Sequence, residues 1–427
     1  MLTGIFIQAQ KVTYNNDIAP IIEKNCSVCH YSNGPTPFPL MKYEDVAKRA
    51  KFISYVTEQR IMPPWKANPD YVHFSNERML KKEDIELIKK WVEGGSKKGS
   101  WFKKAELNSI RKDLGKPDLE LKMAEPIQIV GNNQNTYHCY KIPFELDQDT
   151  FGKVFEFIPD NIEVLHHATF QILSTSESAK IFEPPFQLLY NSENFMDDGG
   201  FYKAMNLVGE DGEFPEVVYG NSWLPGSTVQ IMPEEMGFNI PKKGVIFFNY
   251  IHYSPSPIDQ SDLSGINLYF SESKPQRIIH EQLFKPNFKG LEGILPKDSV
   301  KVIKFEKYLK NKISIFTVIP HMHRLGKYFK AYAVNSKGDT IPLVEVKDWD
   351  FNWQEYYRYK KPVVLDRGTH IHAEAIFDNT KNNLSNPFDP PREIYFNDSM
   401  DEESEMMHLI FLYSSYEPGD EQMKLRH

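Results

Sequence analysis

The spacing of hydrophobic and polar positions changes near residue 119. Before it, apolar residues recur at helical spacing in three segments. These are IAPIIEKN from residue 18, YEDVAKRAKFISYVTEQ from residue 43, and KEDIELIKKWVEGG from residue 82, which ends on Gly94 and Gly95. Apolar residues three or four positions apart form one face of a helix, and a glycine pair is a helix stop signal. We therefore predict three helices in this region.

After residue 119, apolar and polar residues alternate in short runs separated by Pro, Gly, Asn and Asp. Examples are GVIFFNYIHYSP, KISIFTVIPHMH and THIHAEAIFDNT. This period indicates antiparallel sheets. The region is too long for one small sandwich, and SESKPQR offers a boundary near residue 275. We predict a helical domain at 10–97, a polar linker at 98–118, and two β-sandwich domains at 119–274 and 275–427.

Charge and hydropathy limit the partners and the location. The formal net charge is -8, which argues against nucleic acid or an anionic membrane surface as partner. No apolar run approaches the roughly 20 residues that span a bilayer, so we expect no membrane span. The first nine residues, from MLTGIFIQAQ, are interpreted as a trimmed secretion signal, with an ordinary N-terminal strand as the alternative.

The stretch CSVCH carries Cys26, Cys29 and His30. In this spacing two thiols can add to the vinyl groups of a heme while the adjacent imidazole reaches the iron. A thioredoxin-like dithiol expects a βαβ setting, and a zinc site needs another ligand pair nearby. We therefore predict one covalent c-type heme, with Met62 of RIMPPW as the sixth ligand and Met41 and Met79 as alternatives. Residues 12–96 resemble the cytochrome c domains of multidomain bacterial redox proteins, which implies a periplasmic or secreted location.

Five histidines of the β region form a second set of candidates: His166, His167, His252, His321 and His323. Strand residues at i and i+2 project to the same face, so HMH can hold a metal between two imidazoles. The adjacent pair can share a metal only where the strand bulges or ends. Any one of these histidines alone is better explained as a polar strand residue. Together they favour metal binding.

The series DLELKMAEPIQI, TYHCYKIP, LHHATF, IHYS, HMHRLGK and SEMMHLIFLY resembles the copper type II ascorbate-dependent monooxygenases over residues 117–420. The resemblance implies two jelly-roll-like β-sandwiches with one copper each. It assigns His166, His167 and His252 to an electron-transfer copper. It assigns His321, His323 and Met406 to an oxygen-activating copper, with Met407 as the rival thioether. Cys139 lacks the disulfide partner that the family has, and His370 and His372 match no family ligand.

The resemblance implies a monooxygenase that inserts one atom of O₂ into a C–H bond of a small molecule. The electron donor is ascorbate or a redox protein, and the fused heme is predicted to relay electrons to the coppers. A cytochrome that serves a separate partner is the alternative to this relay. A heme-copper electron-transfer or copper-binding protein is the alternative to an enzyme. Ile319, His408 and Ile410 replace residues that bind a peptide carboxylate in the amidating branch, so an apolar or neutral substrate is expected.

Overall fold

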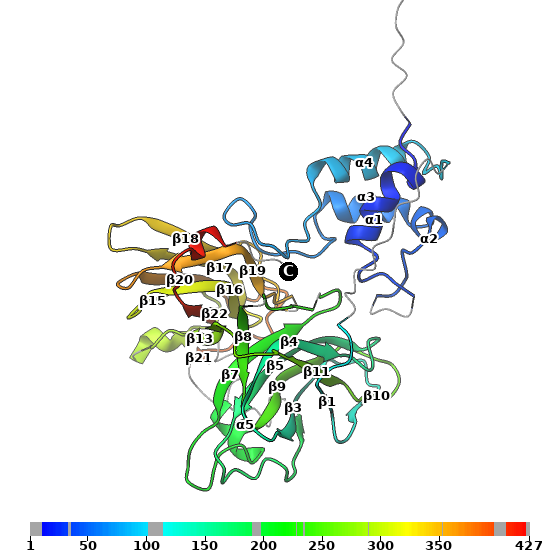
Figure 1. Ribbon diagram of the computed structural model, residues 1–427. Helices are drawn as coiled ribbons and strands as arrows, with labels where there is room; N and C mark the ends of the chain where they lie inside the picture. The colour runs from blue at the N-terminus through cyan, green and yellow to red at the C-terminus, as the bar shows by residue number, and fades with distance from the viewer. Residues whose placement is uncertain are drawn as a thin grey trace, which may run out of the picture. The chain divides into compact units, whose positions relative to one another are not determined.

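A computed structural model describes residues 11–32, 36–100, 114–189, 198–227, 229–233, 235–288, 290–351, 353–396 and 407–423. The chain forms two compact units. One comprises Met1–Trp65 and Glu77–Leu114, and the other comprises Lys66–Asn76 and Gly115–His427. The first unit is helical and the second consists mainly of strands (Figure 1). We call them the helical unit and the β unit.

The helical unit contains a π-helix, Tyr14–Ile18, and four helices: α1 (Ala19–Asn25), α2 (Tyr43–Ala47), α3 (Ala50–Glu58) and α4 (Lys82–Glu93). Ile18, Ile22, Ile88 and Trp91 are fully buried and belong to one hydrophobic core. All three predicted segments are therefore helical. Among the described helices, none is both long and apolar enough to cross a membrane.

The middle helical segment is divided into α2 and α3 at Arg49. The backbone of Arg49 leaves the helical region, and its N–H donates to the carbonyl of Val46 at 3.0 Å. The guanidinium group of Arg49 lies 4.2 Å from the ring centre of Phe38. This side-chain contact accompanies the interruption, which the regular apolar spacing did not predict. α4 ends where the glycine pair predicted, because Gly95 adopts a positive φ of 85°.

The first half of the β unit is a sandwich of two five-stranded sheets. The first sheet has the order β1 (Leu119–Lys122), β11 (Gly265–Phe270), β4 (Thr150–Ile158), β8 (Met236–Ile240) and β12 (Arg277–Ile278). The second has the order β6 (Gln187–Leu189), β3 (Thr136–Glu145), β9 (Lys243–Tyr253), β5 (Leu165–Ser174) and β7 (Glu216–Trp223). Phe155 and Phe157 of β4 contact the ring of Phe170 of β5, as expected for two alternating strands that face one core.

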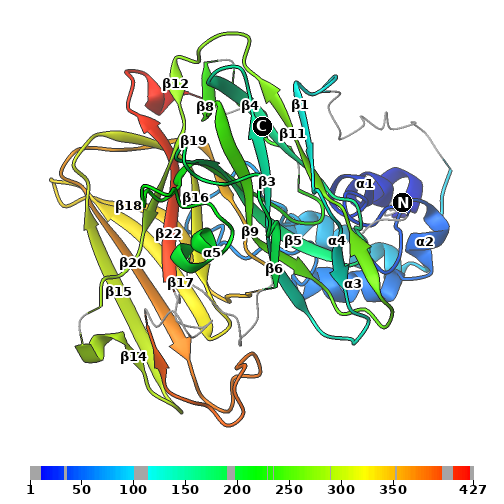
Figure 2. The same ribbon diagram turned by 90° about the horizontal axis from the view of Figure 1, so that it is seen from below.

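Shorter elements complete this half: β2 (Ile127–Ile129) pairs with β10 (Gln260–Asp262), and helix α5 spans Asp198–Ala204. The second half contains two four-stranded sheets (Figure 2). One has the order β13 (His280–Phe284), β22 (Met407–Ser415), β16 (Ile313–Met322) and β19 (Tyr357–Leu365). The other has the order β15 (Val300–Tyr308), β20 (His370–Asp378), β17 (Gly326–Val334) and β18 (Thr340–Val346). The prediction of β-sandwiches is confirmed.

The two halves share part of one core. Phe316 and Leu412 of the second half belong to the same buried cluster as Phe170 and Tyr219 of the first half. A short pair, β14 (Ile294–Leu295) with β21 (Ile394–Tyr395), and 3-10 helices at Gly290–Gly293 and Asp420–Gln422 complete the unit. The shared core fixes the faces that carry the candidate sites.

Residues 66–76 lie between α3 and α4 in the sequence, but they pack on β18 and β19 of the β unit. We call this segment the arm. Phe74 of the arm is 1% exposed, and its ring centre lies 5.1 Å from that of Tyr357. The N–H of Ser75 donates to the carbonyl of Arg358 at 2.7 Å, and the side-chain amide of Asn76 donates to the carbonyl of Tyr356 at 2.9 Å. The arm is therefore part of the β unit, although the sequence placed it in the helical domain.

Candidate metal centres

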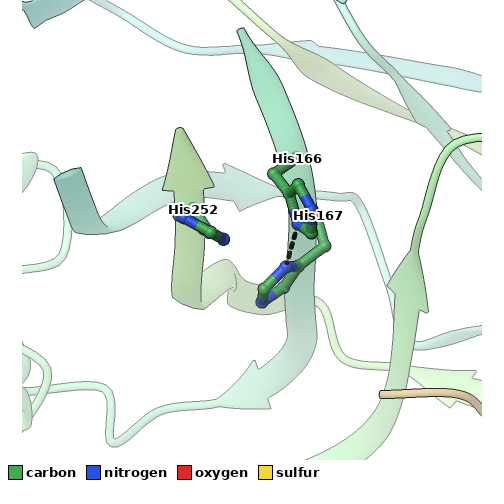
Figure 3. Close-up of side chains that lie close together, drawn as sticks. All are labelled: His166, His167 and His252. Carbon is green, nitrogen blue, oxygen red and sulfur yellow. Dashed lines mark hydrogen bonds between the residues drawn. The ribbon is translucent and has the colours of Figure 1, made fainter. Parts of the chain in front are cut away.

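Three imidazoles from two neighbouring strands meet in the first half of the β unit. His166 and His167 lie at the start of β5, and His252 lies near the end of β9. Their possible ligand nitrogens all lie within 4.8 Å of one another. Figure 3 shows the three side chains gathered together. We call these residues the first cluster.

A β-bulge allows two consecutive histidines to enter the first cluster. Leu165 pairs with Tyr253 and His167 pairs with His252, so His166 is the extra residue on β5. Consecutive side chains of a regular strand point to opposite faces, and a bulge can redirect one of them. The sequence made shared ligation by this pair conditional on such an irregularity, and the structure contains it.

Hydrogen bonds and burial leave one ring nitrogen of this cluster, Nδ1 of His252, without a partner. Nε2 of His252 lies 2.8 Å from Oδ1 of Asn135, which can only accept, so Nε2 carries the hydrogen. Nδ1 of His252 is buried with no hydrogen-bond partner. Nδ1 of His166 and Nδ1 of His167 lie 3.0 Å apart (Figure 3). Burial lowers the pKa of His167 to about 3 and also lowers the pKa of His252, which keeps both imidazoles neutral. An unpartnered buried nitrogen beside two other neutral imidazoles fits a copper or zinc ion.

The second cluster consists of His321, at the end of β16, and His323, which follows that strand. Their ring centres lie 5.0 Å apart and their planes are nearly perpendicular, at 88°. Nδ1 of His321 lies 2.5 Å from Oε1 of Gln354. The amide of Gln354 is itself oriented, because its Nε2 donates to the carbonyl of Phe351 at 3.0 Å. Nδ1 of His321 is therefore the donor, and Nε2 keeps a lone pair for a metal.

Met406 and Met407 are the two candidate thioether ligands of the second cluster. Met406 lies outside the described residues, so its role stays a prediction. Met407 is 4% exposed and is the register partner of Met322, which is fully buried. Met322 lies between His321 and His323 in sequence and therefore points to the opposite face of β16. Met407 faces the core with Met322 and is not available to the second cluster.

His408 lies beside the second cluster; the sequence resemblance placed it at a substrate-binding position but did not place it against a metal ligand. It is the register partner of His321, and the two rings stack with centres 4.2 Å apart and planes at 14°. Burial, followed by the neighbouring imidazoles of His321 and His323, holds the pKa of His408 well below its ordinary value. Only the pairing of β16 with β22 brings the ring of His408 onto that of His321, and no local sequence signal predicts this contact.

A cavity of about 290 Å³ lies between the two halves of the β unit. Both clusters reach it, through His167 on one side and His321, His323 and His408 on the other. Aromatic side chains dominate the wall, among them Phe170, Trp223, Tyr250, Phe351 and Tyr356. Histidines and tyrosines aside, Glu281 is the only ionisable acid or base among the described lining residues. The cavity therefore suits a neutral or apolar molecule better than an anion.

The CSVCH stretch begins at Cys26, the C-cap residue of α1, and forms the turn that follows this helix. The N–H of His30 donates to the carbonyl of Cys26 at 2.9 Å, so both residues belong to one turn. Nδ1 of His30 lies 3.0 Å from the carbonyl oxygen of Phe38, and the two rings stack with centres 5.0 Å apart. A carbonyl oxygen only accepts, so Nδ1 is the donor and Nε2 keeps its lone pair, as an axial heme ligand requires. Burial raises the pKa of Cys26 to about 12.

The remaining sequence candidates are the possible sixth heme ligands, Cys139, the pair His370 and His372, and the N-terminal segment. Met41 and Met62 are exposed and Met79 is partly buried, so burial does not distinguish the possible sixth ligands, and Met62 stays a prediction. Cys139 is a buried free thiol whose Sγ lies 3.2 Å from the carbonyl oxygen of Asn249. His370 and His372 lie on β20, beside Glu306 of β15. The N-terminal segment 1–9 lies outside the described residues.

Comparison with known sequences places the second cluster in a family segment. Residues 299–386 match the family described as copper type II ascorbate-dependent monooxygenase, C-terminal domain. The match includes His321, His323, Phe351 and Gln354, and it begins after the first cluster. This family is copper-dependent, which supports copper as the metal. No curated protein sequence matches the chain.

Comparison with solved structures gives matches of low identity and low TM-score. The VP2 subviral particle protein of infectious bursal disease virus is 7% identical with a TM-score of 0.16, and the alignment covers 72% of this chain and 79% of that chain. The PBSX exported protein XepA is 7% identical with a TM-score of 0.12, and the alignment covers 60% of this chain and 84% of that chain.

Proposed function

We propose that the protein is a copper monooxygenase that hydroxylates a C–H bond of a small neutral molecule with O₂. The observation that carries this proposal is the pair of histidine clusters that open on one cavity, the second within the segment that matches the family. A protein that only stores or carries copper has no need for a substrate-sized, aromatic-lined space between two such clusters.

Each cluster is prepared for copper by its neighbours. Asn135 fixes the tautomer of His252, and Gln354 fixes that of His321. Such outer hydrogen bonds orient ligating imidazoles and hold the lone pair ready for the metal. His321, His323 and Met406 would hold a copper that supplies oxygen activation, and His166, His167 and His252 would hold a copper that supplies an electron. The protein itself orients the ligands and limits the water near them.

The cavity wall restricts the substrate. Ile319, His408 and Ile410 stand at the positions that bind a peptide carboxylate in the amidating branch, and all three line the cavity. No lysine or arginine occurs among the described lining residues, so an anionic substrate would enter without a partner for its charge. A small neutral or apolar molecule is the substrate class that fits, and a peptide ending in glycine does not.

The helical unit is the proposed electron donor. Cys26, Cys29 and His30 would hold a covalent heme, with Met62 as sixth ligand, and the hydrogen bond from His30 to Phe38 supports this role. Ascorbate or a redox protein would supply the electrons. A heme on the same chain stays at high effective concentration near the coppers. Because c-type heme is attached outside the cytoplasm, we place the protein in the periplasm or outside the cell.

An isotope experiment tests the activity. Copper-loaded protein with ascorbate under ¹⁸O₂ is mixed with a panel of small neutral aromatic and aliphatic compounds, and products are examined by mass spectrometry. We expect at least one product that carries a single ¹⁸O atom. His323→Ala should abolish it, whereas His372→Ala, from the second HxH pair on β20, should not. A protein that binds copper but oxidises no compound of the panel would instead support the copper-binding alternative.

A further inference from the structure

Two aromatic rings, Tyr250 and Phe351, connect His167 of the first cluster with His323 of the second in an unbroken row. The ring of His167 stacks on Tyr250 with centres 5.6 Å apart and planes at 24°. Tyr250 meets Phe351 edge to face at 6.3 Å. Phe351 lies 5.6 Å from the ring of His323. Each distance lies within the range for direct aromatic contact, and all four residues line the cavity.

Tyr250 is connected to two of the three histidines of the first cluster. Tyr137 stacks on His252 at 4.5 Å and on Tyr250 at 5.2 Å. His167 and His252 therefore both lead to Tyr250, one directly and one through Tyr137. From Tyr250 a single further ring, Phe351, leads to the second cluster.

Phe351 lies in the connection between β18 and β19, and that connection is held from several sides. Lys66 of the arm pairs with Asp348 at 3.6 Å and with Asp350 at 3.4 Å. The carbonyl of Phe351 accepts the hydrogen bond from Gln354. Gln354 in turn orients His321. The segment that places the bridging ring thus also positions a ligand of the second cluster.

We propose that Tyr250 and Phe351 carry the electron that passes between the two clusters. This proposal rests on the proposed function. With copper held at both clusters, one electron would pass along these rings, so that copper(I) at the first cluster would become copper(II) and copper(II) at the second would become copper(I). No bond forms or breaks and no proton moves in this step, and dioxygen is the oxidant that first oxidises the second centre. The row of rings gives this transfer a contiguous path through packed side chains.

The experiment uses copper-loaded full-length protein, reduced with ascorbate, freed of excess ascorbate and mixed with oxygenated buffer. Freeze-quenched samples are examined by electron paramagnetic resonance, which reports the rate at which copper(II) forms at the first cluster. A double variant, His321→Ala with His323→Ala, provides the reference spectrum of the first cluster alone. We expect copper(II) to form at least about tenfold more slowly in that variant than in the native protein, because the path ends at the second centre.

Phe351→Leu and Tyr250→Leu should slow first-cluster oxidation by about tenfold without changing copper content. Phe351→Tyr and Tyr250→Phe keep the rings and should stay within about twofold of the native rate. Phe288→Leu is the matched control, because Phe288 stacks on Phe396 and does not line the cavity.

The possible outcomes distinguish a failure of the proposed function from a failure of the aromatic path. If the double variant oxidises as fast as the native protein, oxygen reacts at the first cluster itself and the proposed function is wrong. If the double variant is slow but both leucine variants oxidise at the native rate, the function stands and the aromatic path is wrong. Slow oxidation in the tyrosine and phenylalanine variants as well would also reject a path that depends on ring contact.

Discussion

The rings of His321 and His408 stack in nearly parallel planes, 4.2 Å apart, on directly opposite positions of β16 and β22. Two parallel, displaced rings cannot both direct an in-plane nitrogen at one ion. His408 therefore acts on the second cluster by holding the ring of His321, together with the hydrogen bond from Gln354.

We predict that His408→Ala weakens copper binding at the second cluster by about tenfold, the lower end of the range for residues that orient a ligand. His408→Phe keeps a flat ring against His321 and should lose less than His408→Ala. Copper titration followed by electron paramagnetic resonance measures both affinities. Equal affinities in the alanine variant and the native protein would show that the stacked ring has no positioning role.

Removing the buried ring of the arm should destabilise the β unit. Phe74 is 1% exposed and contacts the rings of Tyr357 and Tyr359. Phe74→Ala should cost about 3 to 5 kcal/mol of unfolding free energy. Differential scanning calorimetry can follow the β-unit transition, with Phe52→Ala as control because Phe52 is 55% exposed. A change below about 1 kcal/mol would mean that the arm is not packed as described.

His138 should make the β unit sensitive to acid. Burial lowers the pKa of His138 to about 4, from 6.5, and neither ring nitrogen has a hydrogen-bond partner. Between these values the unfolded chain binds a proton that the folded chain refuses, so stability falls as the pH drops from 6.5 towards 4. The loss from this residue amounts to about 3 kcal/mol.

His138→Phe should remove that part of the pH dependence. Unfolding free energies of copper-free protein at pH 7 and near pH 4 give the comparison, with the exposed His280→Phe as control. Other buried histidines contribute equally to both proteins and cancel in the difference. The same acid sensitivity in His138→Phe and in native protein would contradict a neutral, buried His138.

Heme attachment can be tested on the three cysteines. Cys26→Ser with Cys29→Ser should yield protein from which acid-acetone extracts any heme, because no thioether bond can form. Cys139→Ser is the matched control and should retain heme, since Cys139 is a buried thiol in the β unit. Retention of heme after extraction of the double variant would refute attachment at CSVCH.

Much of the fold follows from the sequence, because the signals involved are local. The helical and alternating periods located the helices and sheets, and HxH spacing placed His321 and His323 together. The sequence also predicted the condition for shared ligation by His166 and His167, that the strand bulges or ends at this pair, and the structure contains the bulge. Each of these inferences needed no knowledge of which strands pair.

The parts that depend on strand pairing were not predictable. His408 reaches His321 only through the register of β16 with β22. Tyr250 and Phe351 look like core aromatics in the sequence, and their row is visible only once the two halves pack. The arm reads as a loop of the helical domain, because its partners on β18 and β19 lie far along the chain.

Copper stoichiometry tests the central claim most directly. We predict two copper ions per chain in the native protein. His252→Ala should lose the first-cluster ion and keep the second, whereas His323→Ala should do the reverse, and Met406→Ile should weaken only the second. Elemental analysis of dialysed protein, combined with electron paramagnetic resonance of each variant, measures this. One ion in the native protein, or loss of both ions in either histidine variant, would contradict two separate copper centres on one cavity.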